Sequence, residues 1–521
     1  MSAEDPSLVH IGIDFGITNS VAYFCKKDRY EYVPFQTKSQ MPSLVIRDGS
    51  KFIVGTLPTK IDSVVFKSVK RLLGQSYRDM DLTDDVSTYG CQIVEGPDHM
   101  CWYKTEERLY SCDEIAVEIF RKLKEEIDKF TDGIVGRTVV SVPARYSSKQ
   151  RYHIKKAAEA AGFNVTNLIN EPTAASVCVS KEKAINGNIL VFDLGAGTTD
   201  VTILHLDDTD YKVESSCGDD HLGGDDFDNC LLHYIEDQYK EKYNKELWDG
   251  MIEVRKIQKM NRLMKSIIQL KHNLSSHSSD DIDMYDIVGG EDEDEDYMIN
   301  VSRATFERLI KPLTSRFSTL IQTALENSKS NLKKKDIDYV VLVGGGCFMP
   351  CVVRQIHDEF PNVEIINMEK KMELVAEGCC TCARKKLKPE FNVLDILSHT
   401  IGLLMGDKSV FPLFKMGTPL PTETLEVTLY ADQPGITSFK TKIVELLDEE
   451  KHEEKPNYSV LADVTSSEFI PDNSKLKEFA FRFRLDASGI FYMEAYALPE
   501  NVKCITKSVE GISVFQKSVY Q

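Results

Sequence analysis

The chain has 521 residues, which is enough for two to four domains of ordinary size. Its composition, 42% hydrophobic and 28% charged, is typical of a soluble globular protein. The formal net charge of −19 argues against direct binding to nucleic acid or to an anionic membrane surface, because both need a basic face.

We find no targeting signal at either end of the chain. MSAEDPSLVH has neither the basic nor the apolar segment of a signal peptide, and the terminal SVYQ is not an ER-retention signal. No apolar run reaches the roughly 18 residues that a membrane span needs. The thirteen cysteines show no framework spacing, so we interpret them as reduced thiols and expect a cytosolic protein.

The first apolar strand ends in a glycine turn. HIGIDFGITNS (10–20) places Asp14 at the strand end, Gly16 in the turn and a hydroxyl at Thr18. ILVFDLGAGTTDVTIL (189–204) repeats this order, which is a weak internal repeat, and VVLVGGGCFMP (340–350) adds a third turn after a strand. Glycine lets the backbone approach a phosphate, and an aspartate at a strand end can hold waters of Mg²⁺. The pair predicts two facing half-sites around one nucleotide, of neither the Walker A nor the Rossmann type.

Helical patterns separate these strands. Residues 113–130 carry an apolar stripe at i, i+4 spacing, and residues 147–162 begin at a serine cap and end at a glycine. A longer helix is predicted over 302–328, with Pro312 as a kink or break. Strands and helices alternate to about residue 388, so we expect an α/β domain over residues 1–388.

The character of the sequence then changes. FAFRFRLDASGIFYMEAYA (479–497) reads as two alternating strands around a tight turn. We expect a linker over 389–400 and an all-β sandwich over 401–521. Two acidic runs, 291–296 and 448–454, are interpreted as solvated loops.

The densest cysteine group is Cys379, Cys380 and Cys382, in a helix predicted to follow Gly378. A metal site is conceivable there. We favour buried small apolar residues, because adjacent cysteines on a helix point to different sides.

Seven motifs occur in the order found in the heat shock protein 70 chaperones: IDFGITNS, VPARYSSKQR, INEPTAAS, FDLGAGTTDVTIL, HLGGDDFDN, LVGGG and DASGI. The chain therefore resembles this family over nearly its whole length. The resemblance implies an actin-like ATPase domain of two lobes that binds ATP or ADP with Mg²⁺. It also implies a β-sandwich that binds extended, unfolded polypeptide.

The resemblance assigns catalytic roles to four residues. Lys70 would reach the γ-phosphate, Glu171 would position the attacking water, and Asp193 and Thr198 belong to the second phosphate turn. Asp14 joins Asp193 as a carboxylate that holds Mg²⁺ through water. A salt bridge without catalytic function is the alternative reading of Lys70 and Glu171. The nucleotide-contacting positions are Asp14, Gly16, Ile17, Thr18, Asn19, Gly195, Ala196, Gly197, Asp200, Gly223, Gly224, Lys271, Ser275, Gly344, Gly345, Gly346 and Phe348.

Several of these positions depart from the family pattern. Ile17 replaces a phosphate-binding threonine, Asn19 a tyrosine, and Ala196 the middle glycine of the second turn. At the adenosine end, apolar side chains replace a carboxylate, a base-stacking arginine and an aspartate, and Gly346 replaces a serine. Each lost hydrogen bond costs on the order of 1 kcal/mol, although an aromatic ring can still stack on a base. The apolar replacements are Ile268, Phe348 and Met372.

The C-terminal part also departs from the family. The chain stops soon after the DASG hairpin, so we expect no helical lid over the sandwich, and Ser398 and His399 interrupt the leucine run of the linker. These features resemble the lidless, ribosome-associated members that work with a J-domain partner.

Two hypotheses for the function follow. In the first, the protein is an atypical chaperone that binds ATP, hydrolyses it slowly or not at all, and assists nascent or unfolded polypeptides with a J-domain co-chaperone at the ribosome. The alternative is an ATP-hydrolysing chaperone with a fast-release peptide clamp. A nucleotide-exchange role is a weaker third reading.

Overall fold

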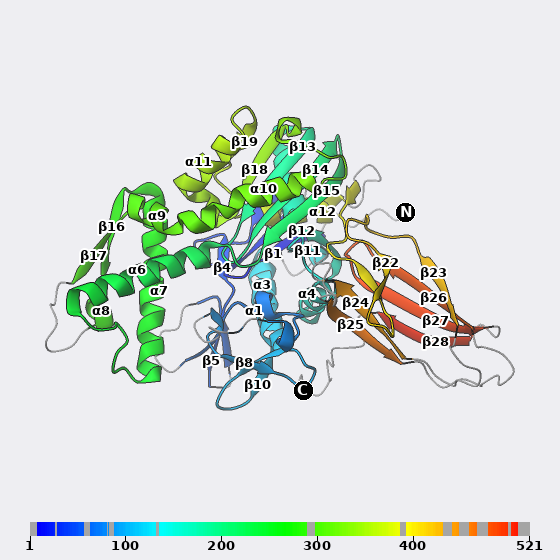
Figure 1. Ribbon diagram of the computed structural model, residues 1–521, viewed down its shortest axis with the longest axis horizontal. Helices are drawn as coiled ribbons and strands as arrows, with labels where there is room; N and C mark the ends of the chain where they lie inside the picture. Colours follow the sequence, from blue (N-terminus) through cyan, green and yellow to red (C-terminus); the bar gives the residue numbers. More distant parts are fainter. Residues whose placement is uncertain are drawn as a thin grey trace.

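The computed structural model describes residues 8–26, 29–49, 51–56, 63–80, 82, 88–131, 135–288, 297–385, 392–430, 440–446, 458–465, 478–498 and 502–508. Two α/β lobes, each built on a large sheet, occupy the left and centre of Figure 1, and a β-sandwich lies at the right. The expected fold class, an α/β domain followed by an all-β sandwich, is confirmed. The two acidic runs lie outside the described residues.

Lobe I comprises the described residues 8–183 together with helix α12. Its large sheet has the strand order β12-β11-β1-β2-β3, with β4 paired to β2. Its elements are β1 (Val9–Phe15), β2 (Asn19–Lys26), β3 (Arg29–Tyr32), β4 (Gln40–Pro42), β5 (Val45–Asp48), β6 (Lys51–Val54), β7 (Val64–Phe66), α1 (Val69–Leu72), η1 (Tyr77–Asp79), β8 (Gln92–Glu95), β9 (Cys101–Lys104), β10 (Leu109–Ser111), α3 (Cys112–Thr131), β11 (Val135–Val142), α4 (Ser148–Ala160), β12 (Val165–Asn170), α5 (Glu171–Lys183) and α12 (Leu374–Lys385).

Lobe II comprises the described residues 187–366. Its large sheet has the order β19-β18-β13-β14-β15-β20. Its elements are β13 (Gly187–Leu194), β14 (Thr199–Asp207), β15 (Asp210–Asp219), α6 (Gly224–Tyr243), α7 (Glu253–Ser276), β16 (Ser279–Asp283), α8 (Tyr285–Val288), β17 (Met298–Ser302), α9 (Arg303–Thr314), α10 (Arg316–Glu326), η2 (Lys334–Asp336), β18 (Tyr339–Val343), η3 (Gly345–Phe348), α11 (Pro350–Glu359) and β19 (Glu364–Ile366); β20 (Asn392–Leu394) adds to the sheet edge.

The weak sequence repeat is a repeat of topology. In each lobe an antiparallel hairpin, β1–β2 or β13–β14, forms the middle of the sheet. A parallel strand adds on one side of the hairpin, β11 or β18, and a second parallel strand follows, β12 or β19. An antiparallel strand adds on the other side, β3 or β15. The two glycine turns therefore occupy equivalent places in the two sheets.

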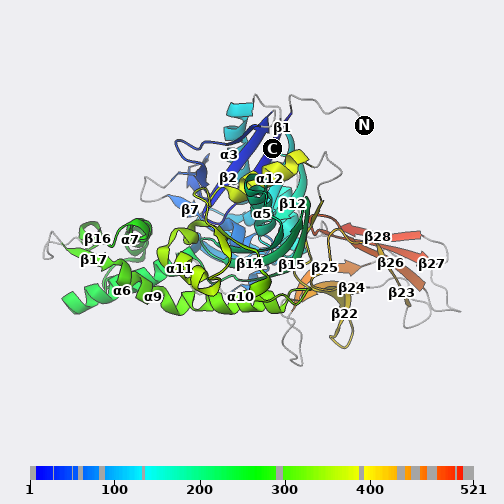
Figure 2. The ribbon, with the colours of Figure 1, turned by 90° about the horizontal axis from the view of Figure 1, so that it is seen from above.

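Helices α12 and α5 lie next to one another near the centre of the molecule (Figure 2). A Cβ atom on Gly378 would lie 1.8 Å from the carbonyl oxygen of Ala174, so only glycine permits this approach. The helix predicted after Gly378 in fact begins earlier, at Leu374, and Gly378 lies inside it because helix packing requires it there. Cys379, Cys380 and Cys382 are buried in this helix, as the favoured reading expected.

The other predicted helices are present with adjusted ends. Ser147 caps α4 by accepting a hydrogen bond from the Gln150 N–H, which stabilises the predicted start. The long helix over 302–328 divides into α9 and α10 at Ser315, whereas Pro312 lies inside α9. The break was therefore placed three residues too early. No helix among the described residues has the length and apolar character needed to cross a bilayer.

The sandwich has two four-stranded sheets, ordered β22-β21-β24-β25 and β23-β26-β27-β28. Phe479, Phe481 and Phe483 alternate with more exposed residues along β26 and form much of its core, as the alternating pattern predicted. Its strands are β21 (Ile401–Leu404), β22 (Val410–Phe414), β23 (Leu425–Tyr430), β24 (Lys440–Leu446), β25 (Tyr458–Thr465), β26 (Glu478–Leu485), β27 (Phe491–Leu498) and β28 (Val502–Ser508).

The sandwich docks on lobe I through the DASG turn. The Ser148 hydroxyl donates to the Gly489 carbonyl at 2.7 Å, and the Leu168 N–H donates to the Ser488 hydroxyl at 3.0 Å. Asp395, which follows β20, accepts from the Asn170 N–H. Part of the predicted linker, 389–391, lies outside the described residues, so the domain limits at 388 and 400 stay a prediction.

Candidate functional site

The three glycine turns open into one cleft of about 580 Å³, lined by residues of both lobes. Nearly every site residue predicted from the sequence lines it. Those residues are Asp14, Gly16, Ile17, Thr18, Asn19, Lys70, Glu171, Asp193, Gly195, Ala196, Gly197, Thr198, Gly224, Lys271, Ser275, Gly344, Gly345, Gly346 and Phe348.

Two predicted residues, Asp200 and Gly223, do not line this cleft. Asp200 is buried behind the second turn, directly opposite Asp193 in the β13–β14 ladder. Gly223 packs on the turn itself, since a Cβ there would lie 2.5 Å from the Ala196 carbonyl oxygen. Both residues support the turn from the side away from the cleft. Residue spacing alone does not distinguish such a supporting position from direct contact with a ligand.

One end of the cleft is a network of buried charges. The Lys70 ammonium donates to the Glu171 carboxylate at 2.6 Å, and both side chains are largely buried. The Ser141 hydroxyl donates to Asp14 at 3.0 Å. Lys70 comes from the short helix α1, Glu171 is the first residue of α5, and Asp14 lies near the end of β1. With Ser141 on β11, four separate elements thus place these groups together.

Burial shifts the pKa values of this network. Burial and the neighbouring Glu171 carboxylate raise the pKa of Asp14 to about 6. Burial, with Glu171 as the next cause, raises the pKa of Asp193 well above its ordinary value. Burial opposes the charge of Lys70, but the Glu171 and Asp14 carboxylates outweigh it and raise its pKa. The network therefore holds more acidic groups than one lysine can compensate.

This surplus of carboxylates fits a divalent cation. Asp14, Glu171 and Asp193 all interact with the single ammonium of Lys70. Oxygen ligands are those that Mg²⁺ prefers, and Mg²⁺ commonly retains waters and uses one or two carboxylates beside a phosphate. The residues present thus fit the predicted Mg²⁺, with Asp14 and Asp193 as the carboxylates at equivalent strand ends.

The first turn is tight and presents an aliphatic side chain, Ile17, to the cleft. A Cβ on Gly16 would lie 2.0 Å from the carbonyl oxygen of Asn19, so the turn requires glycine. Ile17 is half-buried against the cleft, and Thr18, the next residue with a hydroxyl, is exposed. An aliphatic side chain offers no hydrogen bond to a phosphate.

The second turn is held by the start of α6. The Gly195 N–H donates to the Thr198 carbonyl, which closes the turn. The N–H groups of Gly224 and Asp225 donate to the carbonyls of Gly195 and Ala196. Since these donors are already used, the N-terminus of α6 positions the turn and does not itself offer those amides to a phosphate.

Sequence reasoning missed Arg71. A Cβ on Gly197 would lie 1.9 Å from its guanidinium, and the same group lies 3.6 Å from the Asp225 carboxylate of α6. Arg71 of lobe I therefore contacts lobe II beside the second turn. The only signal in the sequence was its position directly after Lys70. A basic residue on a short helix can equally be an exposed surface side chain, so this signal was not specific.

The opposite end of the cleft is lined by α7, η3 and the segment before α12. Lys271 donates to the Gly224 carbonyl at 2.8 Å and to the buried Asp228 carboxylate at 2.7 Å. The Ser275 hydroxyl donates back to the Lys271 carbonyl at 3.5 Å. The ammonium of Lys271 is thus committed to the protein.

Apolar side chains dominate the rest of this end. Ile268 is 38% exposed and Phe348 is 44% exposed, and both line the cleft beside Met372. The Lys371 ammonium lies 4.1 Å from the centre of the Phe348 ring, a cation–π contact. Lys371 and His272, which also line the cleft, were not predicted from the sequence.

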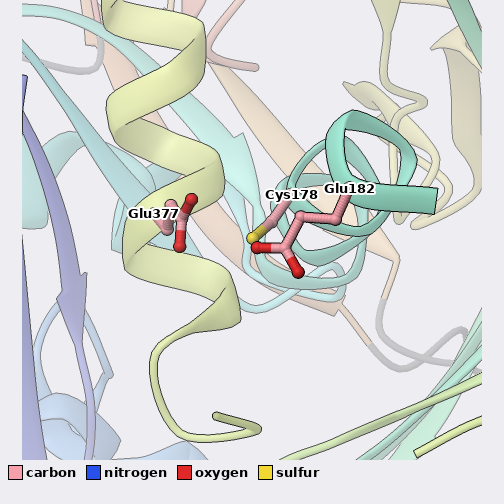
Figure 3. Close-up of side chains that lie close together, drawn as sticks. All are labelled: Cys178, Glu182 and Glu377. Atoms are coloured by element: carbon pink, nitrogen blue, oxygen red, sulfur yellow. The ribbon is translucent and has the colours of Figure 1, made fainter. Parts of the chain in front are cut away.

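A second cluster of acidic groups lies between α5 and α12. Figure 3 shows Glu377 of α12 pointing toward Cys178 and Glu182 of α5, with the ligand atoms of all three within 4.8 Å of one another. The Lys370 ammonium donates to both carboxylates, at 2.6 Å for Glu377. Burial raises the pKa of the Cys178 thiol, which disfavours the thiolate. A lysine thus stands where a metal ion would, and we assign no metal here.

Comparison with known proteins places these features in a family. A model of the Hsp70 protein family matches residues 10–513. Heat shock 70 kDa protein 2 of Paracoccidioides lutzii is 29% identical over 508 residues, covering 93% of this chain and 74% of the relative. Chaperone protein dnaK of Cyanidium caldarium is 29% identical over 506 residues, with 93% and 78% covered. Chaperone protein DnaK of Deinococcus deserti is 28% identical over 501 residues, with 93% and 76% covered. The chain belongs to the Hsp70 family of chaperones.

Proposed function

We propose that this chaperone binds ATP with Mg²⁺ in the cleft, hydrolyses it slowly or not at all, and assists the folding of nascent or unfolded polypeptides. The observation that carries the proposal is the contrast inside the phosphate-binding end. Lys70 and Glu171 are paired at 2.6 Å beside Asp14, whereas Ile17 stands in the turn where a hydroxyl would contact phosphate.

The chain's own groups account for binding without fast turnover. The amides of the second turn and the Lys70 ammonium bind phosphate oxygens, and Glu171 holds the attacking water by a hydrogen bond. Asp14 and Asp193 would hold Mg²⁺ through water, and the ion would supply charge compensation for the phosphates. Ile17 removes one hydrogen bond from the group that is cleaved. A lost donor at such a position costs on the order of 10²-fold in rate.

The contacts of the linker support coupling between the cleft and the sandwich. Asp395 accepts from the Asn170 N–H at 3.1 Å and from the Thr173 hydroxyl at 2.8 Å. Both donors belong to the start of α5, whose first residue is Glu171. A change in the linker therefore bears directly on the helix that carries the water-positioning carboxylate.

The partners follow from the resemblance and are part of the proposal. We assign a J-domain co-chaperone as the partner, the cytosol as the compartment and the ribosome as the place of action. In the linker, Ser398 donates to the Tyr146 carbonyl of lobe I and His399 faces the buried Glu445 of the sandwich. Purified ribosomes should co-sediment with the chain and its J-domain partner, and not with the chain alone.

Replacing Ile17 by threonine tests the core of the proposal. The variant should hydrolyse ATP faster than the wild-type chain, because it regains a hydroxyl at the cleaved phosphate. Ile53→Thr is the matched control, since Ile53 is a partly exposed isoleucine on β6, outside the cleft. A similar rate for all three proteins would contradict the role given to Ile17.

Binding itself is measured by thermal unfolding of the full chain with and without Mg²⁺·ATP. A ligand at a hundred times its dissociation constant stabilises the folded state by about 2.7 kcal/mol. The midpoint should rise clearly. An unchanged midpoint at millimolar ATP would overturn nucleotide binding.

The alternative function is an active ATPase with a fast-release peptide clamp. The intact Lys70–Glu171 pair favours it. In that case a J-domain protein should stimulate ATP turnover and peptide release together, and Lys70→Ala should abolish turnover while peptide binding persists.

A further inference from the structure

The end of the cleft opposite Lys70 and Glu171 lacks a fixed pattern of hydrogen-bond donors and acceptors. If the phosphates of a nucleotide occupy the charged end, the base extends toward α7 and η3. Apart from Lys271 and Lys371, the side chains that we place at this end are Ile268, His272, Ser275, Phe348 and Met372. Three of these five are apolar and cannot read the edge of a base.

The two uncharged polar side chains, Ser275 and His272, can each donate and accept a hydrogen bond. The Ser275 hydroxyl donates weakly to a carbonyl of its own helix at 3.5 Å and can rotate. Burial, followed by the nearby Lys271 and Lys38 ammonium groups, lowers the pKa of His272. A neutral imidazole has one donor and one acceptor nitrogen, and the tautomer can adapt to the ligand.

The two lysines at this end, Lys271 and Lys371, do not distinguish adenine from guanine either. Lys271 is committed to the Gly224 carbonyl and to Asp228 at 2.8 and 2.7 Å. Lys371 lies against the ring of Phe348, 4.1 Å from its centre. Because this ammonium is held against the ring, the base acceptor it can add is at most N7, which adenine and guanine share.

Among the described residues at this end, Phe348 offers the largest aromatic surface for a base. Its ring is 44% exposed while one face is covered by Lys371. Stacking of a base on an aromatic ring does not depend on the hydrogen-bonding edge of the base, because every base has a π face. A larger purine ring system covers more of the phenylalanine than a pyrimidine does.

We propose that this end of the cleft selects a purine by stacking on Phe348 and does not distinguish adenine from guanine, so that ATP and GTP are both ligands. Strong rejection of a related ligand requires fixed polar groups that would be left unpaired. Adenine presents an amino group where guanine presents a carbonyl oxygen, and both Ser275 and a neutral His272 can pair with either. The inference rests on the proposed nucleotide site and names the class of nucleotide that it accepts.

Calorimetric titration of the full chain with the Mg²⁺ complexes of ATP, GTP and CTP tests the proposal. The dissociation constants for ATP and GTP should agree within about fivefold, and CTP should bind at least tenfold more weakly. Binding of ATP with GTP a hundredfold weaker would overturn this inference and leave the proposed function intact. No binding of any of the three would overturn the proposed function itself.

A variant separates stacking from other sources of affinity. Phe348→Ala should weaken the binding of ATP and of GTP by the same factor, on the order of tenfold, and weaken the binding of CTP less. Phe130→Ala is the matched control, because Phe130 of α3 has the same 44% exposure and does not line the cleft. A loss of affinity for ATP alone would contradict the stacking of both purines on Phe348.

Discussion

The two ends of the cleft differ in how their side chains are held. At the phosphate end, Lys70, Glu171 and Asp14 are all buried or half-buried and interact with one another. At the base end, Ile268 and Phe348 are 38% and 44% exposed. Side chains that share one network cannot be exchanged singly, because removing one charge leaves the others uncompensated. Exposed, separately packed side chains can be replaced one at a time.

The same contrast holds between the two glycine turns. The second turn is tied to α6 through the carbonyls of Gly195 and Ala196, so an extra methyl at Ala196 leaves its backbone bonds in place. In the first turn Ile17 is half-buried against the cleft and offers no hydrogen bond to a ligand.

Lys70→Ala should have the largest effect on stability. It leaves the Glu171 and Asp14 carboxylates without their cation, and breaking a buried pair costs about 4 kcal/mol. Urea unfolding without nucleotide measures it. The control is Lys51→Ala on the exposed face of β6, which should change the free energy of unfolding by less than about 0.5 kcal/mol. If Lys70→Ala combined with Glu171→Gln is no more stable than Lys70→Ala alone, the network does not behave as a coupled unit.

The pH dependence of the metal-free chain should be the next largest effect. The pKa of Asp14 is raised to about 6, and burial and the nearby Asp220 carboxylate raise that of Asp200 to about 7. The folded state then binds more protons than the unfolded chain between about pH 4 and pH 7, so these groups lower the free energy of unfolding as pH rises.

Asp14→Asn isolates the contribution of Asp14 to this pH dependence. Measured in EDTA at pH 8, the variant should be more stable than the wild-type chain, on the order of 2 kcal/mol, and its stability should vary less between pH 5 and pH 8. With Mg²⁺·ATP present the wild-type chain should be the more stable of the two, because the variant lacks the Asp14 carboxylate that would hold Mg²⁺. Equal slopes with pH for both proteins would contradict the shifted pKa.

Ile268→Glu should give the smallest effect, at the base end. A carboxylate at this partly exposed site can accept from ribose hydroxyls, a gain of about 1 kcal/mol or roughly fivefold in affinity. Ribose is common to ATP and GTP, so both should gain equally in a calorimetric titration. Ile53→Glu on β6 should change neither. An unchanged affinity would show that ligands do not reach this residue.

Local patterns predicted much of the fold and most of the site. A strand that ends in Asp-x-Gly needs only a short stretch of sequence, so Asp14, Gly16 and Asp193 could be found without a structure. Alternation along 479–485 likewise predicted a half-buried strand. The break between α9 and α10 was misplaced, because a proline inside a helix can be accommodated and the packing of both halves decides where the chain bends.

By itself the sequence determined the family, the two glycine turns with their carboxylates, and the order of the domains, since these are written in contiguous motifs. Only the tertiary structure decided which side chains meet across long separations. Arg71 reaches the turn at Gly197, Lys371 covers Phe348, and Lys370 neutralises Glu377. Asp200 and Gly223 moved behind the cleft for the same reason: a position in a motif does not state which side of a packed turn faces the ligand.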